Sequence, residues 1–387
     1  MLGADIISRR AQEIPPFVVM DVLEKAQGME REGIPVIHLE VGEPDFDAPP
    51  CVTAALCKAL SDGETHYTHS LGIPELREAI SRYYLETYGA RVHPDQILVT
   101  NGTSPGFFLI LSALLNPGEE IIISDPHYCC YPNFIRFVGG VPVTVPVFEE
   151  DGFQYTAEGI APKISPKTKG ILINSPSNPT GNLLSPDRMR EIAEFSPYII
   201  SDEIYHGLVY GEAAHSILEF TDRAFVLNGF SKLYAMTGLR LGYLIAPRGF
   251  MRPLQKIQQN FFISAAAPVQ YAGIAALSGS QGEVTRMVAT YDERRKYMLK
   301  RLNAMGFGIT VPPTGAFYVF ANAKHISADS FRLSLDILEK AHVACTPGVA
   351  FGAGGEGYLR FSYANSLENL AEALRRLETY LAQRRPG

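Results

Sequence analysis

Residues 198–232 read YIISDEIYHGLVYGEAAHSILEFTDRAFVLNGFSK, and this stretch decides the fold class. It holds two short apolar runs, at 198–201 and 224–227, and each run is followed at once by polar residues. Runs that are apolar at nearly every position are typical of strands buried on both faces of a parallel sheet. The stretch therefore predicts two neighbouring strands of an α/β sheet, with Asp202 at the end of the first and Lys232 shortly after the second.

The same pattern recurs on both sides of this stretch. Further apolar runs lie at 97–100, 121–124, 171–174 and 243–246. A segment of helical period, 107–115, lies between the first two of them. Alternation of strands and helices indicates a mainly parallel sheet flanked by helices, because parallel strands need a crossover connection.

After residue 278 the pattern changes to α+β. A long charge-rich helix is predicted over 285–305. It is followed by predicted strands at 308–311 and 316–321, a helix at 330–342, a strand at 358–363 and a closing helix at 367–383. An N-terminal helix over 16–32 precedes the α/β pattern, and we expect it to join this second lobe. The predicted domains are a large one at 46–282 and a small one made of 1–45 with 283–387.

Composition narrows the classes of protein to which the chain can belong. Its 387 residues are 46% hydrophobic, enough for one large core and a second lobe. The net charge is −7 and the chain has no extended basic run, so neither nucleic acid nor a membrane is expected as a partner. The five cysteines, two of them adjacent at Cys129 and Cys130, show no metal or disulfide spacing and predict reduced thiols in a cytoplasmic protein.

Candidate functional residues follow the predicted strands, because ligands of such sheets bind at the carboxyl ends of the strands. After 97–100 comes Asn-Gly-Thr-Ser-Pro-Gly at 101–106, where Ser104 is expected to cap a helix and Pro105 to occupy its first position. The free amides of that helix start predict an anion site. After 171–174 a turn with two prolines presents Asn178.

Each of these signals also has an ordinary structural explanation. A capped helix start, a proline turn and a buried ion pair at Asp202 are all common in proteins without a ligand. Together, however, they supply an amine, an acid, hydroxyl and amide donors, and an anion cradle in chain order. That is the set of groups that a pyridoxal phosphate enzyme needs.

With these motifs in view, the sequence resembles the class I/II aminotransferases, pyridoxal-phosphate enzymes of fold type I, and among them the bacterial aspartate, alanine and aromatic aminotransferases. The resemblance covers nearly the whole chain. It rests on VGEPDF at 41–46, HYT at 66–68, GIPELR at 72–77, NPTG at 178–181, SDEIY at 201–205, SK at 231–232 and YLRFS at 358–362. The fold that it implies is a large α/β domain with a smaller α+β domain.

The resemblance also implies roles for individual residues around the cofactor. Lys232 matches the lysine that bonds to the cofactor aldehyde and shuttles the proton, and Asp202 matches the partner of the ring nitrogen. Tyr205 and Asn178 match the donors to the ring oxygen. Tyr128 matches the aromatic residue that stacks on the cofactor ring. The residues that match the phosphate cradle are Gly102, Thr103, Ser104, Ser231 and Arg240.

Further matches concern the substrate and the assembly. Arg360 matches the arginine that binds the substrate carboxylate, with Gly42 and Asn178 beside it. Tyr67 matches a residue that reaches the phosphate of the other subunit, which implies a homodimer with shared active sites. One departure is Gly229, where many members have a serine, so one hydroxyl is missing at the expected phosphate site.

The implied reaction is a ping-pong transfer of an amino group from an L-amino acid to a 2-oxo acid, with 2-oxoglutarate or pyruvate as the acceptor. The apolar segment 14–18 favours a small or hydrophobic amino donor. An alternative on the same fold is a pyridoxal-phosphate β-lyase that cleaves a C–S bond. A second alternative, the effector domain of a transcription regulator, requires a basic DNA-binding module that this sequence lacks.

Overall fold

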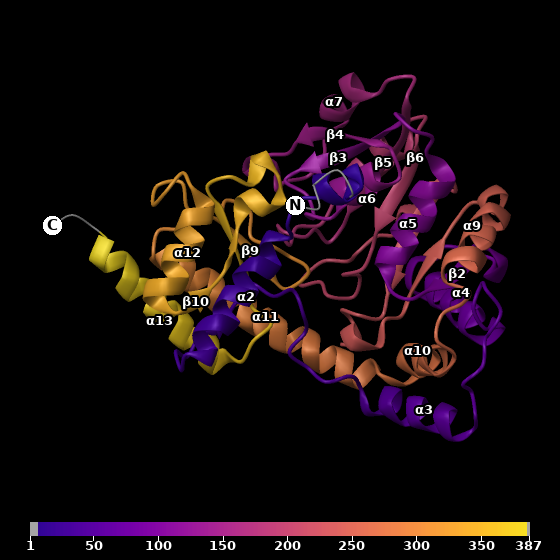
Figure 1. Ribbon diagram of the computed structural model, residues 1–387, viewed down its shortest axis with the longest axis horizontal. Coiled ribbons are helices and arrows are strands. Elements are labelled where there is room, and N and C mark those ends of the chain that lie inside the picture. Colours follow the sequence, from indigo (N-terminus) through magenta and orange to yellow (C-terminus); the bar gives the residue numbers. More distant parts are fainter. Residues whose placement is uncertain (1–6, 385–387) are drawn as a thin grey trace.

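A computed structural model of the protein describes residues 7–384 (Figure 1). Within it, seven strands form the central sheet. Their order across the sheet is β2-β8-β7-β6-β5-β3-β4. In chain order they are β2 (Ile97–Thr100), β3 (Glu120–Asp125), β4 (Val141–Pro146), β5 (Thr168–Asn174), β6 (Tyr198–Asp202), β7 (Ala224–Gly229) and β8 (Gly242–Ile245). The neighbours from β4 to β7 pair in parallel, whereas β8 is antiparallel to both β7 and β2. The mainly parallel sheet predicted from the apolar runs is confirmed.

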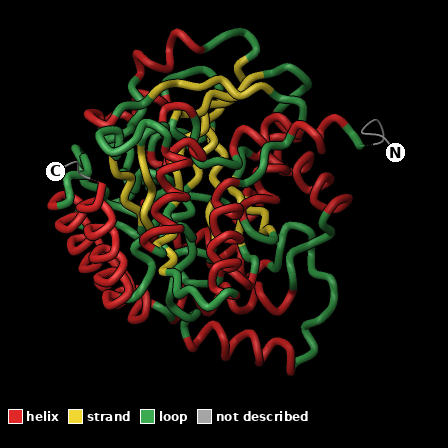
Figure 2. The backbone as a smooth tube through the Cα atoms, turned by 60° about the vertical axis from the view of Figure 1, so that its left-hand side comes forward, coloured by secondary structure: helices red, strands yellow, loops and turns green. Residues whose placement is uncertain are grey.

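Helices cover this sheet, and Figure 2 shows them packed around the strands. They are α3 (Pro50–Ser61), α4 (Pro74–Tyr88), α5 (Thr103–Leu114), α6 (Tyr131–Phe137), α7 (Ala157–Ile160), α8 (Pro186–Ala193), α9 (Arg248–Phe261) and α10 (Ala267–Gly279). The strands β2, β7 and β8 are buried at every residue, so both faces of the sheet are covered. This double burial explains why their sequences are apolar without alternation.

The edge strand β4 was not predicted from the sequence. Its residues VPVTVP contain two prolines, and most of its side chains are exposed or half-buried. Proline lacks an amide donor and is tolerated in a sheet mainly at an edge, where one side of the strand needs no partner. The apolar pattern that marks the central strands is therefore absent at this position.

The second lobe contains two small sheets and further helices. Its elements are α2 (Val18–Arg31), β1 (Ile37–His38), α11 (Gln281–Ala304), β9 (Tyr318–Asn322), α12 (Ser330–Ala341), β10 (Val343–Ala344), β11 (Thr346–Pro347), β12 (Tyr358–Ser362) and α13 (Leu367–Arg384). The short helix α1 (Arg9–Glu13) lies instead beside α6 of the large lobe, with Arg10 over the ring of Phe137. One sheet pairs β1 with β10 in parallel, and the other has the antiparallel order β11-β12-β9. Figure 1 shows α11 running from this lobe toward the sheet-bearing lobe.

A strand predicted at 308–311 is wrong. Only Gly308 makes a bridge, to Asn322, and the backbone amide of Thr310 donates instead to Glu149 at 3.1 Å. Two prolines follow at 312–313 and remove the amide donors that a longer strand would need. The neighbouring strand also begins later than expected, at Tyr318, because Ala316 adopts a left-handed conformation with φ of 55°.

The N-terminal helix α2 packs on the second lobe, beside elements far from it in sequence. Val22 and Ala26 of α2 form a buried cluster with Leu338 and Ala344. The division into domains at 46–282 and at 1–45 with 283–387 stays a prediction, and residues 1–6 and 385–387 of it lie outside the described residues. Segment 39–45, which follows β1, runs between the two lobes and reaches the site described next.

Candidate active site

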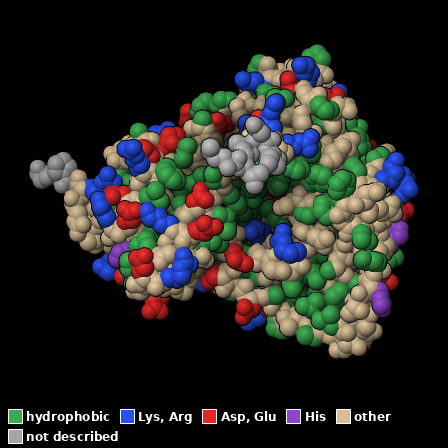
Figure 3. Space-filling view, in the orientation of Figure 1, with side chains coloured by type: hydrophobic (Ala, Val, Ile, Leu, Met, Phe, Trp, Pro, Cys, Tyr) green, Lys and Arg blue, Asp and Glu red, His purple; other side chains and the backbone are tan. Residues whose placement is uncertain are grey.

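A cavity of about 340 Å³ lies between the two lobes, and Figure 3 shows a hollow in this face bordered by hydrophobic and basic side chains. Both lobes contribute to its wall. From the large lobe come the ends of β5, β6 and β7 and the start of α5, and from the second lobe come α2, β9 and β12. Eleven of the predicted site residues line it: Gly42, Thr103, Ser104, Tyr128, Asn178, Asp202, Tyr205, Ser231, Lys232, Arg240 and Arg360.

Lys232 follows β7 and brings a buried amine into the cavity. Its Nζ donates a hydrogen bond of 2.5 Å to the carbonyl oxygen of Gly42. Burial lowers the pKa of Lys232 to about 8, and the neighbouring cations Arg360 and Arg240 act in the same direction, opposed by the acids Glu43 and Asp202. An amine with this pKa is partly neutral near pH 7, which makes it a better nucleophile than an exposed lysine.

Asp202 ends β6, and its carboxylate is held by neutral donors. The phenol of Tyr131 donates to Oδ2 at 2.7 Å, and the backbone amide of Ile204 donates to Oδ1 at 3.2 Å. Burial raises the pKa of Asp202 to about 6, and these hydrogen bonds oppose that rise. A buried carboxylate without a cation in direct contact is costly, so a cationic group placed in the cavity would be stabilised by it.

Another end of the cavity is suited to an anion. Thr103 and Ser104 lie in the first turn of α5, where amides without helical partners and the helix dipole favour negative charge. Ser231 and Arg240 also line the cavity. Gly102 has φ of 93°, and a Cβ there would lie 2.5 Å from an Nη atom of Arg240, so glycine allows the guanidinium to pack against the loop.

The predicted cap of this helix is wrong in detail. The helix begins at Thr103 and its N-cap is Gly102, without a side-chain hydrogen bond, so Ser104 does not cap it and Pro105 is not its first residue. The backbone conformation of Gly102 is open only to glycine, which places the start two residues earlier than a serine cap would. Ser104 lies instead in the first turn of the helix and lines the cavity.

Arg360 on β12 is 3% exposed and is oriented by three acceptors. Nη1 donates to Oδ1 of Asn178 at 2.8 Å. Nη2 donates to the carbonyl oxygen of Glu40 at 2.5 Å and to the hydroxyl of Thr346 at 3.2 Å. The guanidinium lies over the ring of Tyr318 at 4.3 Å from its centroid, and among the described residues its Nε has no hydrogen-bond partner. A buried, fixed guanidinium with a free donor is suited to a carboxylate.

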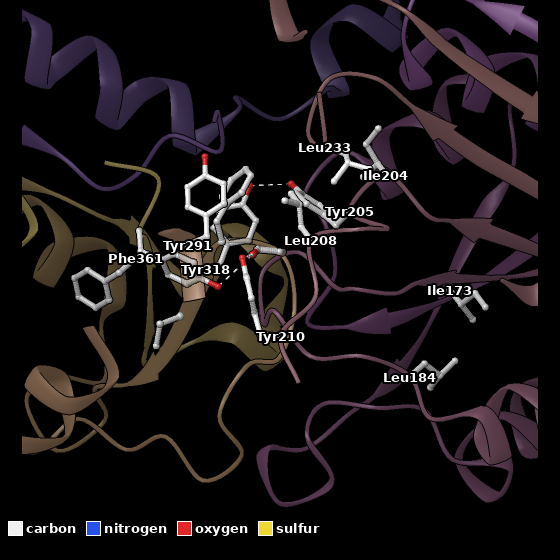
Figure 4. Close-up of a cluster of buried hydrophobic side chains, with 14 of the residues drawn as sticks. Ile173, Leu184, Ile204, Tyr205, Leu208, Tyr210, Leu233, Tyr291, Tyr318 and Phe361 are labelled. Atoms are coloured by element: carbon white, nitrogen blue, oxygen red, sulfur yellow. Dashed lines mark hydrogen bonds between the residues drawn. The ribbon is translucent and has the colours of Figure 1, made fainter. Parts of the chain in front are cut away.

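Tyr205 meets Tyr318 across the two lobes, and Figure 4 shows the two phenols pointing toward one another. Their oxygens are 2.8 Å apart. Gly42 lies against Tyr318, since a Cβ at residue 42 would be 2.2 Å from the Tyr318 hydroxyl. This glycine is therefore required for the close approach of segment 39–45 to the cavity.

Two predicted residues lie outside the cavity wall. Gly102 lies behind Arg240, and Tyr67 is 82% exposed on the surface. Gly229, the departure from the family pattern, does not line the cavity either. A Cβ there would be 3.0 Å from Cα of Gly242, so its lack of a side chain allows β7 and β8 to approach closely.

Sequence reasoning missed four residues that the cavity depends on. Tyr131 bonds to Asp202, Tyr318 supports Arg360, and the hydroxyl of Thr237 donates to the carboxylate of Glu43. Tyr131 could have been found, because it lies only three residues after the predicted site residue Tyr128, and the two rings are in contact. The other contacts join segments far apart in the chain and leave no local signal.

Cysteines and candidate metal ligands add little to this site. All five cysteines are unpaired, and Cys129 lines the cavity. In the chain from 7 to 384, no cluster of three or more His, Cys, Asp or Glu side chains is placed to hold a metal ion. No helix in that part of the chain combines the length and the apolar character that a membrane crossing requires.

The model of the family described as aminotransferase class I and II matches residues 34–377. The chain belongs to this family. Known aminotransferases also match it over nearly their full length, so amino-group transfer is its activity. The curated (5-formylfuran-3-yl)methyl phosphate transaminase of Methanocaldococcus jannaschii is 44% identical, over 97% of this chain and 100% of that protein.

Other relatives of this aminotransferase agree with the fold. The aspartate aminotransferase of Pyrococcus horikoshii is 40% identical over 97% of both chains. The solved structure of Thermus thermophilus aspartate aminotransferase with maleate superposes with a TM-score of 0.93 at 36% identity, over 98% of this chain and 100% of that one. The fold of the chain is therefore that of the class I/II aminotransferases.

Proposed function

We propose that this aminotransferase uses pyridoxal 5′-phosphate to move the amino group of an L-amino acid to a 2-oxo acid by a ping-pong mechanism. The observation that carries the proposal is that Lys232, Asp202 and Arg360 line one cavity of about 340 Å³. They supply an amine of lowered pKa, an acid that lacks a cation in direct contact, and a guanidinium with a free donor. No single one of these groups is specific, but the combination is what this cofactor and an amino acid require.

The cavity residues would hold the cofactor by its three polar parts. Asp202, when ionised, would keep the ring nitrogen protonated, and Tyr205 and Asn178 would donate to the ring oxygen. The phosphate would lie at the start of α5, whose amides and dipole favour an anion. Side chains around that phosphate would be Thr103, Ser104, Ser231 and Arg240, with Tyr128 against the ring.

When bound, pyridoxal phosphate supplies an aldehyde that receives the amino group and a ring that accepts electrons from the amino acid. Lys232 would hold the cofactor covalently through Nζ, and the same Nζ would accept and return the proton at Cα of the substrate. The pKa of Lys232, lowered to about 8 by burial, suits an amine that must both accept and release a proton near neutral pH.

The substrate carboxylate would bind Arg360. Within residues 7–384, Nε–H and one N–H of Nη1 have no partner, while the contacts of Nη1 and Nη2 with Asn178, Glu40 and Thr346 hold the guanidinium plane in place. Asn178 and Gly42 also line the cavity, and both would contribute to binding of the carboxylate. Both the amino acid and the 2-oxo acid carry this carboxylate, so one arginine serves both half-reactions.

The choice of amino donor would follow from the cavity wall contributed by residues 17–23. Its lining side chains are Phe17, Val19, Met20 and Leu23, all apolar. The cations that line the cavity are Lys232, Arg240 and Arg360, and each already serves the cofactor or the α-carboxylate in this proposal. The amino donor is therefore expected to have a small or hydrophobic side chain, since no further cation in the described wall could pair with a distal carboxylate.

The active sites would be shared in a homodimer, with Tyr67 reaching the phosphate of the other subunit. Tyr67 is 82% exposed although it is large and aromatic. Gln255 and Gln259 of α9 both donate to Ser70, three residues after Tyr67, and Phe261 at the end of α9 is also exposed. Exposed aromatic surface next to a site is typical of subunit contacts.

A half-reaction screen tests this function. Holoenzyme is mixed with each L-amino acid in turn, without a 2-oxo acid, and the absorbance of the lysine-bound cofactor is followed. We expect it to convert to that of the aminated cofactor, with release of the matching 2-oxo acid. Phenylalanine, leucine and alanine should act at lower concentrations than aspartate and glutamate.

Two outcomes would contradict the proposal. If no amino acid changed the spectrum of the holoenzyme, transamination at this site would be excluded. Release of pyruvate and ammonia from cysteine conjugates, without need of an acceptor, would instead favour the C–S β-lyase. Faster conversion with aspartate than with phenylalanine would leave the reaction standing and refute the proposed donor class.

A further inference from the structure

The residue whose backbone carbonyl holds Arg360, Glu40, also carries a buried carboxyl group. Glu40 is 0% exposed, and Nδ1 of His38 lies 2.7 Å from its Oε1. Within residues 7–384 the second oxygen, Oε2, has no hydrogen-bond partner. An ionised carboxylate can only accept, so Nδ1 of His38 carries the proton in this contact. Burying such a group with a single partner is costly, which makes that partner important.

The backbone of the same glutamate holds the arginine. The carbonyl oxygen of Glu40 accepts from Nη2 of Arg360 at 2.5 Å and from the hydroxyl of Thr346 at 3.1 Å. The Thr346 hydroxyl in turn accepts from Nη2. A change in the position of Glu40 would therefore move one of the three acceptors that orient the guanidinium.

The backbone of residues 37–39 is held by β10 on one side and by β12 on the other. Ile37 and His38 pair with β10, and the amide of Leu39 continues that pairing by donating to Ala344 at 2.9 Å. The amide of Ser362 donates to the carbonyl oxygen of Leu39 at 2.7 Å. Because the backbone is held up to Leu39, the side-chain contact with His38 decides how Glu40 is oriented.

Few other charged groups face this pair. Glu30 of α2 lies 3.3 Å from Nε2 of His38, on its outer side. The thiol of Cys345 is buried near Glu40, which helps to raise the pKa of that thiol. Arg376 of α13 donates to the backbone carbonyls of Pro35 and His342, close to the start of β1. Within residues 7–384, His38 is thus the only cation in direct contact with the carboxylate of Glu40, whereas Arg360 contacts its backbone carbonyl.

We propose that His38 and Glu40 form a positioning pair that holds Arg360 ready for the substrate carboxylate, and that loss of the charge on His38 weakens carboxylate binding. This inference rests on the proposed role of Arg360. Neither member of the pair touches the substrate, so both act through the carbonyl oxygen of Glu40. The pair makes the affinity for carboxylates depend on pH.

The direction of this dependence follows from the contacts of His38. Its hydrogen bond with Glu40, together with the charge of Glu40 and with Glu30, raises the pKa of His38 to about 8, while burial opposes the rise. The charged pair is therefore complete below pH 6.5, the ordinary pKa of histidine, and is lost as the pH rises through about 8. Above that pH His38 no longer carries the charge that faces the carboxylate of Glu40, so the contact that orients Glu40 is weakened.

The test measures binding rather than turnover. The ligand is 3-phenylpropionate, a carboxylate without an amino group, and its dissociation constant from the holoenzyme is measured by calorimetry at pH 7 and pH 9. Titration at the cofactor affects all variants alike, so the ratio of the two constants is compared between variants. We expect the ratio of the dissociation constant at pH 9 to that at pH 7 to be about fivefold larger in the wild type than in Glu40→Gln.

Further variants separate a positioning role from a structural one. His38→Asn should bind weakly already at pH 7 and show the same small ratio as Glu40→Gln. Glu30→Gln, an exposed change, should keep the wild-type affinity at pH 7 and move the midpoint of the transition to lower pH. His215→Asn removes a comparable histidine–glutamate contact, 2.9 Å to Glu219, on an exposed loop and should behave as wild type.

Failure of the positioning pair and failure of the proposed carboxylate site give different results in these measurements. Equal ratios in the wild type, Glu40→Gln and His38→Asn, or an unmoved midpoint in Glu30→Gln, would overturn the positioning pair. Arg360→Lys should lose most of its affinity at both pH values. Undiminished binding in that variant would instead refute the proposed carboxylate site itself, so the two failures are distinguishable.

Discussion

The phenol of Tyr131 donates a 2.7 Å hydrogen bond to Oδ2 of Asp202, and both groups are buried. This contact joins the start of α6 to the end of β6. It favours the ionised form of the carboxylate, against the burial that raises the pKa of Asp202 to about 6. Tyr131 thus supports the charge that the proposed cofactor requires.

Tyr131→Phe should lower kcat/KM about tenfold near pH 6.5, because removing a hydrogen bond to a buried charged group costs roughly 1.5–3 kcal/mol. The pKa of Asp202 rises, and since the ionised form is the active one, the acid limb of the pH profile moves to higher pH. The measurement is kcat/KM from pH 5 to 9. Tyr155→Phe, which removes a phenol bonded to the carbonyl of Leu172, is the control and should leave the acid limb in place. An unshifted limb in Tyr131→Phe would refute this role.

Gly102→Ala should weaken cofactor binding about tenfold and lower stability. The new Cβ would lie 2.5 Å from Arg240, and φ is 93°. Gly63→Ala is the matched control, because its φ is 84° and nothing lies within 4 Å of a Cβ there. A positive φ strains the backbone and lowers the stability of both variants, whereas displacement of Arg240 occurs only in Gly102→Ala. Dissociation constants for pyridoxal phosphate and thermal melting separate the two effects, and equal constants in both variants would show that Arg240 does not hold the phosphate.

Lys232 should control the rate at which the apoprotein takes up its cofactor. Burial lowers the pKa of Lys232 to about 8, so the neutral, reactive amine is the minor form below that pH and the major form above it. The rate of covalent capture should therefore rise about tenfold per pH unit toward pH 8 and level off beyond it. Stopped-flow absorbance of the apoprotein mixed with pyridoxal phosphate measures this rate.

Lys232→Ala should bind the cofactor without a covalent bond and lose turnover. Borohydride reduction followed by mass spectrometry should add one cofactor to the wild type and none to the variant. Lys324→Ala, a lysine outside the cavity wall that lies over the ring of Tyr358, is the control and should retain the added mass. Full activity in Lys232→Ala would rule out the assignment.

The parts of the fold that could be predicted from sequence are those where burial of a strand on both faces leaves an apolar run in its own sequence. The strands around Ile199, Val226 and Val99 are buried on both faces, so their apolar runs identified them. Strand β4 lies at an edge, where prolines are tolerated and the pattern disappears. The false strand at 308–311 shows the converse, because apolar residues occur there although the amide of Thr310 donates to the side chain of Glu149 and not to a neighbouring strand.

The same distinction applies to the site. Lys232, Asp202 and Arg360 follow or lie on strands and carry family motifs, so the sequence placed them in one cavity. Their supports, such as Tyr131, Tyr318 and Glu40, act across the chain, and a contact between residues 40 and 360 has no signature within either segment. The start of α5 was misplaced because the conformation of one glycine, rather than a capping side chain, determines it.

A mixture of two impaired variants tests the proposed shared sites. If Tyr67 serves the partner's phosphate, a heterodimer of Tyr67→Ala and Lys232→Ala has one site with both residues intact and one site with neither. In a 1:1 mixture refolded together, half of the dimers are heterodimers, so about a quarter of the wild-type activity should return. If Tyr67 instead served its own subunit, each site would keep one defect and mixing would add nothing. Because Tyr67 is 82% exposed and does not line the cavity of its own chain, we expect the activity to return.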